Sequence, residues 1–247
     1  MGILRINIMR NETLAVIIPV YNEESSIEKV VDDWVSILEK LNIDFKMCLY
    51  DDGSKDKSFE VLSKIAFNNN RIIIETHPNM GHGPTVLKGY LENLNSDYIF
   101  QVDSDDEISA EKFHDFWNQK QDFDAVFGRR IYNRKPLSRV IISFIAFLIV
   151  RIFYGKGIYD VNVPFRLMKT NAIKEIIKKI PPKTFAPNIM ISGMMCLNRL
   201  KIKTIPVHHQ HRKAGQVSIK KWKLVNASFL SFKQITAFRC GSINMHR

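Results

Sequence analysis

Two carboxylates, Asp103 and Asp105, flank Ser104 directly after an apolar run that ends at Val102. Because the chain turns there, a hard cation can sit against both side chains. Mg²⁺ and Mn²⁺ take one or two protein carboxylates and fill their remaining positions with water and phosphate oxygens. Such an ion would neutralise the charge that builds on a leaving nucleoside diphosphate. Alone, this triplet is also common in loops and caps, so its surroundings decide its meaning.

The elements around this triplet indicate an α/β fold. Short β-branched runs alternate with helical patterns, which predicts a doubly wound, mainly parallel sheet in a three-layer, Rossmann-like sandwich. Strands are expected at 14–20, 45–51, 71–77, 97–103 and 124–130. An amphipathic helix is expected over 27–41, with Ser25 and Glu28 as a capping box at its start. Shorter helices are expected at 58–67, 84–94 and 109–119.

Polar side chains follow three of these strands. They occupy 19–23, 51–54 and 103–107, and each group begins at the carboxyl end of its strand. In open α/β sheets, ligands bind outside the carboxyl ends of the strands, where helix N-termini also point. We therefore expect the three groups to share one binding rim.

The second half of the chain differs in pattern. Residues 140–155 are apolar apart from Ser143, Arg151 and Gly155, but the run is too short to span a bilayer. It predicts an interfacial helix, with a buried core helix as the alternative. A helix at 187–200 and a strand at 202–211 follow. Residues 218–247 form a basic, amphipathic C-terminal helical extension to a main domain of residues 1–217.

Charge is divided unevenly over the 247 residues. Residues 1–150 hold 17 Lys and Arg against 23 Asp and Glu, whereas 151–247 hold 19 against 2. The second half is therefore expected to meet an anionic partner. Nucleic acid is not expected, because the basic residues interleave with long aliphatic runs rather than with base-stacking aromatics.

The cysteine count and the N-terminal pattern indicate the cellular compartment in which the protein works. Cys48, Cys196 and Cys240 are odd in number and far apart, which predicts neither a disulfide framework nor a metal knuckle. The first twenty residues lack the pattern of a secretory signal. We expect a cytoplasmic protein, peripheral at the inner face of the membrane, of unknown oligomeric state.

Four motifs in order give the sequence a recognisable resemblance. They are VIIPVYNEESSIEKVV (16–31), YDDGSKDKSFEVL (50–62), NMGHGPTVLKGY (79–90) and YIFQVDSDDEI (98–108). In order and spacing they resemble the family 2 glycosyltransferases, which have the GT-A fold. Later segments at 128–130, 160–169 and 208–218 resemble the branch that contains dolichyl-phosphate mannose synthase and bacterial polyprenyl-phosphate sugar transferases. The resemblance covers roughly residues 14–223.

The resemblance implies roles for particular residues. Asp103 faces the ribose or sugar, Asp105 holds Mg²⁺ or Mn²⁺, and Glu107 stands where relatives place a metal-binding glutamine. The residues implied at the nucleotide sugar are Pro19, Tyr21, Glu23, Asp52, Lys88, Ser104, Arg212 and Lys213. Guanidinium groups offer paired donors to phosphate oxygens, so the candidates for an acceptor phosphate are Arg129, Arg130 and Arg166.

The implied reaction is an inverting sugar transfer from a UDP- or GDP-linked donor to a polyprenyl phosphate at the cytosolic membrane face. A hydroxyl acceptor needs a general base, whereas a phosphate acceptor is already anionic. Asn188 stands where relatives often place a carboxylate, which favours the phosphate. The alternatives are transfer to a hydroxyl of a polysaccharide or glycolipid, and a non-catalytic, membrane-associated binding module. His209 and His211 could share a strand face, but no zinc site is expected there without a nearby carboxylate or cysteine.

Overall fold

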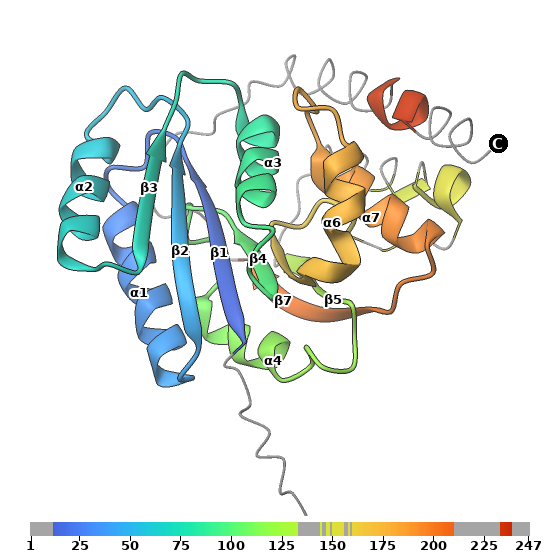
Figure 1. Cartoon of the computed structure of the whole chain (residues 1–247), viewed down its shortest axis with the longest axis horizontal. Coiled ribbons are helices and arrows are strands. Elements are labelled where there is room, and N and C mark those ends of the chain that lie inside the picture. The colour runs from blue at the N-terminus through green and yellow to red at the C-terminus, as the bar shows by residue number, and fades with distance from the viewer. Residues whose placement is uncertain are drawn as a thin grey trace, which may run out of the picture.

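The computed structural model describes residues 12–132, 144, 147–148, 150–155, 158, 160–209 and 233–238. These residues form one seven-stranded sheet in the order β3-β2-β1-β4-β6-β5-β7 (Figure 1). All of its strands run parallel except β6, which is antiparallel to both β4 and β5. The strands are β1 (Thr13–Val20), β2 (Asp44–Asp51), β3 (Ile72–Thr76), β4 (Tyr98–Val102), β5 (Ala125–Tyr132), β6 (Phe165–Lys169) and β7 (Ile202–His209).

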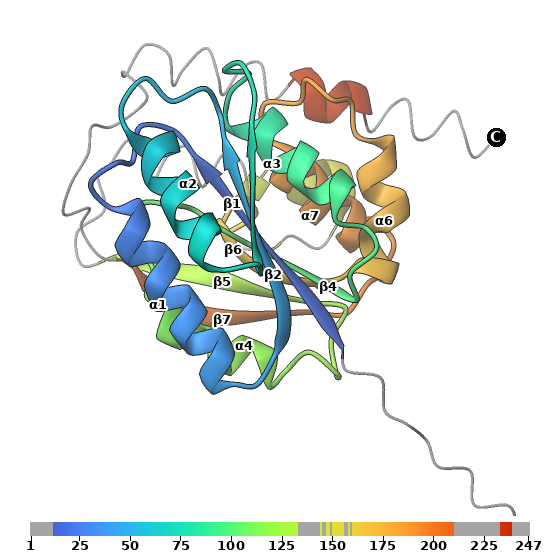
Figure 2. The ribbon, with the colours of Figure 1, turned by 60° about the vertical axis from the view of Figure 1, so that its left-hand side comes forward.

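Helices cover both faces of the sheet (Figures 1 and 2). On one face lie α1 (Ile27–Lys40), α2 (Ser58–Asn68), a short 3-10 helix (Ala110–Lys112) and α4 (Phe113–Trp117). On the other lie α3 (His82–Glu92), α6 (Thr170–Lys179) and α7 (Pro187–Leu197). The predicted three-layer α/β sandwich with a mainly parallel sheet is confirmed.

Helix α1 shows how an apolar stripe sets the layer. Ile27, Val30, Val31, Trp34 and Leu38 recur at helical spacing and are buried. The Trp34 ring lies 5.1 Å from that of Phe100 on β4, which attaches the helix to the middle of the sheet. The predicted capping box is wrong: the N-cap is Ser26, whose hydroxyl bonds to the Glu23 carboxylate instead of capping the helix.

Strand β6 and helix α6 were not among the expected elements. Phe165 and Leu167 are buried on the strand, as is Arg166 between them, so β6 shows no alternation of apolar and polar residues. A strand inserted between β4 and β5 is covered on both faces and loses the period-2 signal.

The segment at 140–155 is described in part. Residues 144, 147–148 and 150–154 are helical. Tyr154 is buried against Gly193 and donates its hydroxyl to the Ile235 carbonyl, whereas Phe144, Leu148 and Ile152 are exposed. The described part therefore packs on the protein along one side and presents apolar side chains along another. No helix among the described residues is long and apolar enough to cross a membrane.

The C-terminal extension falls mostly outside the described residues. Residues 233–238 are helical, and Gln234 bonds to the backbone of Phe185 and Lys183. The proposed division of the chain at residues 217 and 218 therefore stays a prediction.

Candidate active site

The acidic loop after β4 lines a recess at the carboxyl edge of the sheet. The residues around this recess are Val102, Asp103, Asp105, Glu107, Ile108, Pro164 and His209. The order β3-β2-β1-β4 places β4 beside β1, so the acidic loop leaves the sheet where the strand order reverses, and the recess lies on the β6 and β7 side of this loop. Ligands bind at such switch points in doubly wound sheets. The structure thus brings Asp103, Asp105 and Glu107 together, with Ser104 buried between the two aspartates.

Asp103 is held by two side chains from different elements. Its Oδ1 lies 3.0 Å from Nε2 of His82 and 3.1 Å from Nε2 of Gln101. His82 begins α3, after Gly81, whose φ of 93° suits glycine. Burial acts to lower the pKa of His82, but Asp103, Asp105 and Asp52 raise it by more. The protonated ring, which carries a positive charge, is therefore favoured beside the carboxylates.

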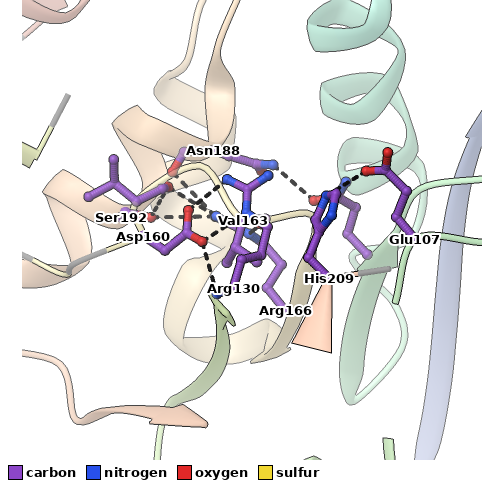
Figure 3. Close-up of polar contacts among 10 residues, drawn as sticks. Glu107, Arg130, Asp160, Val163, Arg166, Asn188, Ser192 and His209 are labelled. Atoms are coloured by element: carbon purple, nitrogen blue, oxygen red, sulfur yellow. Dashed lines mark hydrogen bonds and ion pairs between the residues drawn. The ribbon is translucent and has the colours of Figure 1, made fainter. Parts of the chain in front are cut away.

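Glu107 pairs with a histidine on the edge strand β7. Its Oε2 lies 2.6 Å from Nε2 of His209, the last residue of β7 (Figure 3). The His209 ring lies 4.5 Å from the ring of Tyr132, which ends β5. The backbone N–H of Glu107 in turn donates to Oδ1 of Asp105. No carboxylate lies near His209 in the sequence, but residues distant in sequence meet at this edge and bring Glu107 to its ring.

The three candidate arginines have three different environments, and Figure 3 shows two of these residues, Arg130 and Arg166. Arg166 is 0% exposed, and its guanidinium donates to the carbonyls of Val161, Val163 and Asn188. Burial lowers its pKa. This burial does not support its predicted contact with an acceptor phosphate, which stays a prediction.

Arg130 and Arg129 differ in their access to ligands. Arg130 donates to both carboxylate oxygens of Asp160, at 2.8 and 2.7 Å, so much of its donor capacity is engaged within the protein. Arg129 is exposed on β5. Arg129 is therefore the candidate whose guanidinium is most accessible to an external phosphate.

The first rim segment follows β1. Pro19 is buried in the strand, Tyr21 is partly exposed and Glu23 is buried. The Glu23 backbone N–H donates to the Ser58 hydroxyl at 2.7 Å, and the Glu23 carboxylate accepts from Ser26 at 2.9 Å. These bonds tie the loop to the start of α2 and shape the side of the rim next to β4.

Asp52 organises the loop that leads into α3. Its two carboxylate oxygens accept from the backbone N–H groups of Met80 and Gly81, at 2.7 and 3.0 Å. A Cβ on Gly53 would lie 2.8 Å from the Asn79 nitrogen, so this loop is closely packed. Asp52 therefore supports the rim through the backbone, and its predicted position near the base stays a prediction.

Lys88 lies away from the recess. Its ammonium pairs with Glu75 at 2.6 Å and with Glu92, between α3 and the edge strand β3. These contacts do not support its predicted position at the donor. Arg212, Lys213 and His211 lie outside the described residues.

The donor set suits a hard divalent ion. Asp103, Asp105 and Glu107 supply carboxylate oxygens, and Mg²⁺ or Mn²⁺ needs only one or two of these beside water and phosphate. Within the described ranges, no group of three His, Cys, Asp or Glu side chains is arranged to hold a metal ion. The residues fit an ion that is held by a pair of carboxylates and completed by its substrate.

Sequence reasoning missed His82, Gln101 and His209 as neighbours of the acids. Gln101 could have been found, because alternation on a strand places residues 101 and 103 on the same face. The pairing of Glu107 with His209 joins residues on opposite sides of β6 and β5, and local patterns carry no signal for it.

An open, mainly parallel sheet with an acidic loop at its switch point is typical of the nucleotide-binding α/β class. The family model described as glycosyl transferase family 2 matches residues 15–177, and the chain belongs to that family. The predicted family and its GT-A fold are thereby confirmed.

Two curated relatives span much of the chain. It is 26% identical over 221 residues to an undecaprenyl-phosphate 4-deoxy-4-formamido-L-arabinose transferase of Photorhabdus laumondii, covering 87% of this chain and 66% of that protein. The chain thus spans about two thirds of the length of that relative. It is 33% identical over 173 residues to an uncharacterized protein of Methanocaldococcus jannaschii, covering 65% of this chain and 73% of that protein.

Solved structures share the fold at lower identity. Glucosyl-3-phosphoglycerate synthase from Mycobacterium tuberculosis, in a complex with Mn²⁺, UDP-glucose and phosphoglyceric acid, has a TM-score of 0.66 and is 15% identical, covering 93% of this chain and 80% of the other. Mannosyl-3-phosphoglycerate synthase from Rubrobacter xylanophilus has a TM-score of 0.66 and is 11% identical, covering 91% and 73%.

Proposed function

We propose that this protein transfers a sugar, with inversion, from a UDP- or GDP-linked donor to a polyprenyl phosphate at the cytosolic face of the membrane. The observation that carries the proposal is the recess beside the switch point, where Asp103, Asp105 and Glu107 share one lining. A divalent ion that binds a pyrophosphate needs this concentration of negative charge at a sheet edge. The family membership agrees with a sugar-transfer reaction.

The proposed roles follow from position. Asp103 and Asp105 act at the donor, and Asp103, Asp105 and Glu107 are the residues that would hold Mg²⁺ or Mn²⁺. When bound, such an ion stabilises negative charge on the leaving diphosphate. The loop at 19–23 forms the nucleoside side of the rim together with Asp52, and Arg212 and Lys213, outside the described residues, are assigned to the diphosphate from the family resemblance alone. The structural neighbour that holds Mn²⁺ and UDP-glucose supports this assignment through its shared fold.

The acceptor is assigned from position 188, where an asparagine takes the place of a carboxylate that could act as a general base. Asn188 is buried, and its amide bonds to Tyr90 at 2.9 Å and to Gln101 at 2.9 Å. An amide engaged in this way cannot deprotonate a hydroxyl. A phosphate acceptor needs no such step, because its oxygen is already anionic. The relative from Photorhabdus laumondii, named for undecaprenyl phosphate, supports the same acceptor.

Membrane contact is assigned to the helical residues 144, 147–148 and 150–154. Phe144, Leu148 and Ile152 are spaced four residues apart, and their exposed fractions are 61%, 42% and 66%. Side chains at this spacing share one face of a helix. An apolar face on a helix next to a basic half-chain suits the interface of an anionic bilayer.

The test is a transfer assay with labelled UDP- and GDP-sugars, undecaprenyl phosphate in vesicles, and Mn²⁺ or Mg²⁺. We expect labelled lipid with at least one donor, and a loss of about 100-fold or more in Asp105→Asn, because that change removes a charge from the site. Asp115→Asn is the matched control, since Asp115 is exposed on α4 and pairs with Lys112 outside the recess, and its transfer rate should match the wild type.

Two outcomes would redirect the assignment. Label in a polysaccharide or glycolipid without label in the isoprenoid would move the acceptor to a hydroxyl. If the protein shows neither sugar transfer nor metal-dependent nucleotide binding, it is a non-catalytic binding module rather than an enzyme.

A further inference from the structure

We infer that Gln101 is the positioning residue for Asp103, and that Tyr90 and Asn188 set the direction of its amide. The inference deepens the proposed function and rests on Asp103 acting at the donor. Gln101 lies on β4 and is 0% exposed, and its Nε2 donates to Oδ1 of Asp103 at 3.1 Å. It contacts the site only through that carboxylate.

The first step is the orientation of the Asn188 side chain. Tyr90 on α3 is buried, and its hydroxyl lies 2.9 Å from Oδ1 of Asn188 on α7. Burial raises the pKa of Tyr90, so the hydroxyl keeps its proton and can donate. With Oδ1 accepting from Tyr90, the Asn188 amide nitrogen turns the other way, toward Gln101.

The second step is the orientation of Gln101. Nδ2 of Asn188 donates to Oε1 of Gln101 at 2.9 Å, and the Tyr90 hydroxyl lies 3.1 Å from the same oxygen. Because the single Tyr90 proton is used in the bond to Asn188, the Asn188 amide is the donor to Oε1, and Nε2 of Gln101 then faces Asp103. The opposite orientation would set two amide nitrogens against each other and an oxygen against a carboxylate, and buried groups pay a large cost for such mismatches.

The backbone of Asn188 is also anchored. Its carbonyl accepts from the Arg166 guanidinium at 3.2 Å, so the buried arginine that reaches no ligand holds the start of α7 (Figure 3). Strand β4 and helices α3 and α7 thus meet in one buried polar cluster of Gln101, Tyr90 and Asn188 directly beneath the acidic loop.

The consequence falls on a single carboxylate. Gln101 contacts Oδ1 of Asp103 from below and His82 contacts the same oxygen from the exposed side. Neither of these bonds uses Oδ2. The two bonds therefore fix the carboxylate through Oδ1, and Oδ2 would be the oxygen that meets the donor or its metal.

The experiment measures binding of UDP and GDP in the presence of Mn²⁺ by titration calorimetry on the full chain. Gln101→Leu removes the donor at similar size, and we expect the dissociation constant to rise by about 10- to 100-fold, the usual effect of removing a group that orients a ligand. Adding Gln101→Leu to Asp103→Asn should cause no further loss, because the glutamine acts through that aspartate.

Two further variants keep the test decisive if Gln101→Leu does not fold. Asn188→Asp removes the donor to Oε1 at constant shape and should weaken binding in the same direction. Tyr50→Phe is the matched control for side effects of altering a buried polar side chain, since the Tyr50 hydroxyl bonds to Glu92 away from the recess, and it should bind as the wild type does.

Wild-type affinity in both Gln101→Leu and Asn188→Asp, or full additivity in the double variant, would overturn the inference. Failure of the wild type itself to bind either nucleotide would instead overturn the proposed function, so the two failures are distinguishable.

Discussion

Arg129 on β5 and Arg166 on β6 lie on two paired strands, yet their side chains have opposite environments. Arg166 is enclosed, with its N–H groups on backbone carbonyls and its guanidinium 4.5 Å from the Phe127 ring, whereas Arg129 is exposed. A buried guanidinium is tolerated only when its donors are satisfied. At the scale of single residues, burial and hydrogen bonding therefore decide which basic groups can serve a ligand.

Replacing Arg166 by methionine should destabilise the fold. The carbonyls of Val161, Val163 and Asn188 would lose their donor, and we expect the free energy of unfolding to fall by roughly 2–4 kcal/mol. Urea unfolding measures the change. Arg129→Met is the control and should stay within about 0.5 kcal/mol of the wild type. Equal stability of Arg166→Met and the wild type would contradict the structural role.

Cys48 should resist alkylation in the native protein. Burial raises the pKa of its thiol to about 11, and Sγ lies 3.3 Å from the Asn93 amide oxygen. At pH 8 the thiolate fraction is then on the order of one in a thousand. Mass spectrometry after brief iodoacetamide treatment should find Cys48 unmodified in buffer and modified in urea. Modification at equal rates in both would show that the residue is accessible.

At the scale of elements, the contact between α3 and the segment before α7 supports the rim. A Cβ on Gly83 would lie 2.0 Å from the Phe185 carbonyl oxygen and 2.6 Å from that of Thr184. Both neighbours are backbone atoms, so the two segments would have to separate. Because His82 and Tyr90 lie on α3, their bonds to Asp103, Gln101 and Asn188 depend on this approach.

Gly83→Ala should therefore affect both stability and the site. We expect a loss of about 1–3 kcal/mol in unfolding free energy, the usual cost of overpacking, together with weaker Mn²⁺-dependent binding of nucleoside diphosphate. Thermal unfolding and calorimetry measure the two effects. Leu91→Ala, at an exposed position on the same helix, should change neither. Wild-type behaviour of Gly83→Ala in both assays would contradict the close packing.

At the scale of the whole molecule, the exposed apolar side chains of the segment at 144–154 and the basic second half should act together on a membrane. The apolar side chains supply area that is buried in the membrane interface, and the basic residues supply attraction to anionic lipid. Electrostatic attraction weakens as salt rises, whereas the apolar contribution does not. The two contributions can therefore be separated by ionic strength.

Changing Phe144, Leu148 and Ile152 together to serine should weaken binding to anionic vesicles by at least about tenfold, because each apolar side chain loses its favourable transfer from water. Sedimentation with vesicles at low and high salt measures the loss. Phe59 and Phe67, exposed on α2, changed to serine provide the control and should leave binding unchanged. Equal binding by the triple variant and the wild type would remove this segment from the membrane contact.

Local patterns determined strands β1 to β5, strand β7 and most of the helices, because burial on one face leaves a periodic trace in the chain. They also determined that three polar segments share one rim, since parallel strands end at the same edge. The position of Asp103, Asp105 and Glu107 together was foreseeable on that ground alone.

Only the tertiary structure decided the rest. It inserted β6 antiparallel between β4 and β5, turned Arg166 inward, held Lys88 away from the recess, and brought His209 to Glu107 and Asn188 to Gln101. Each of these outcomes depends on partners far apart in the chain, and a buried polar side chain takes its role from the groups that satisfy its hydrogen bonds. Sequence periodicity reports burial but not the identity of those partners.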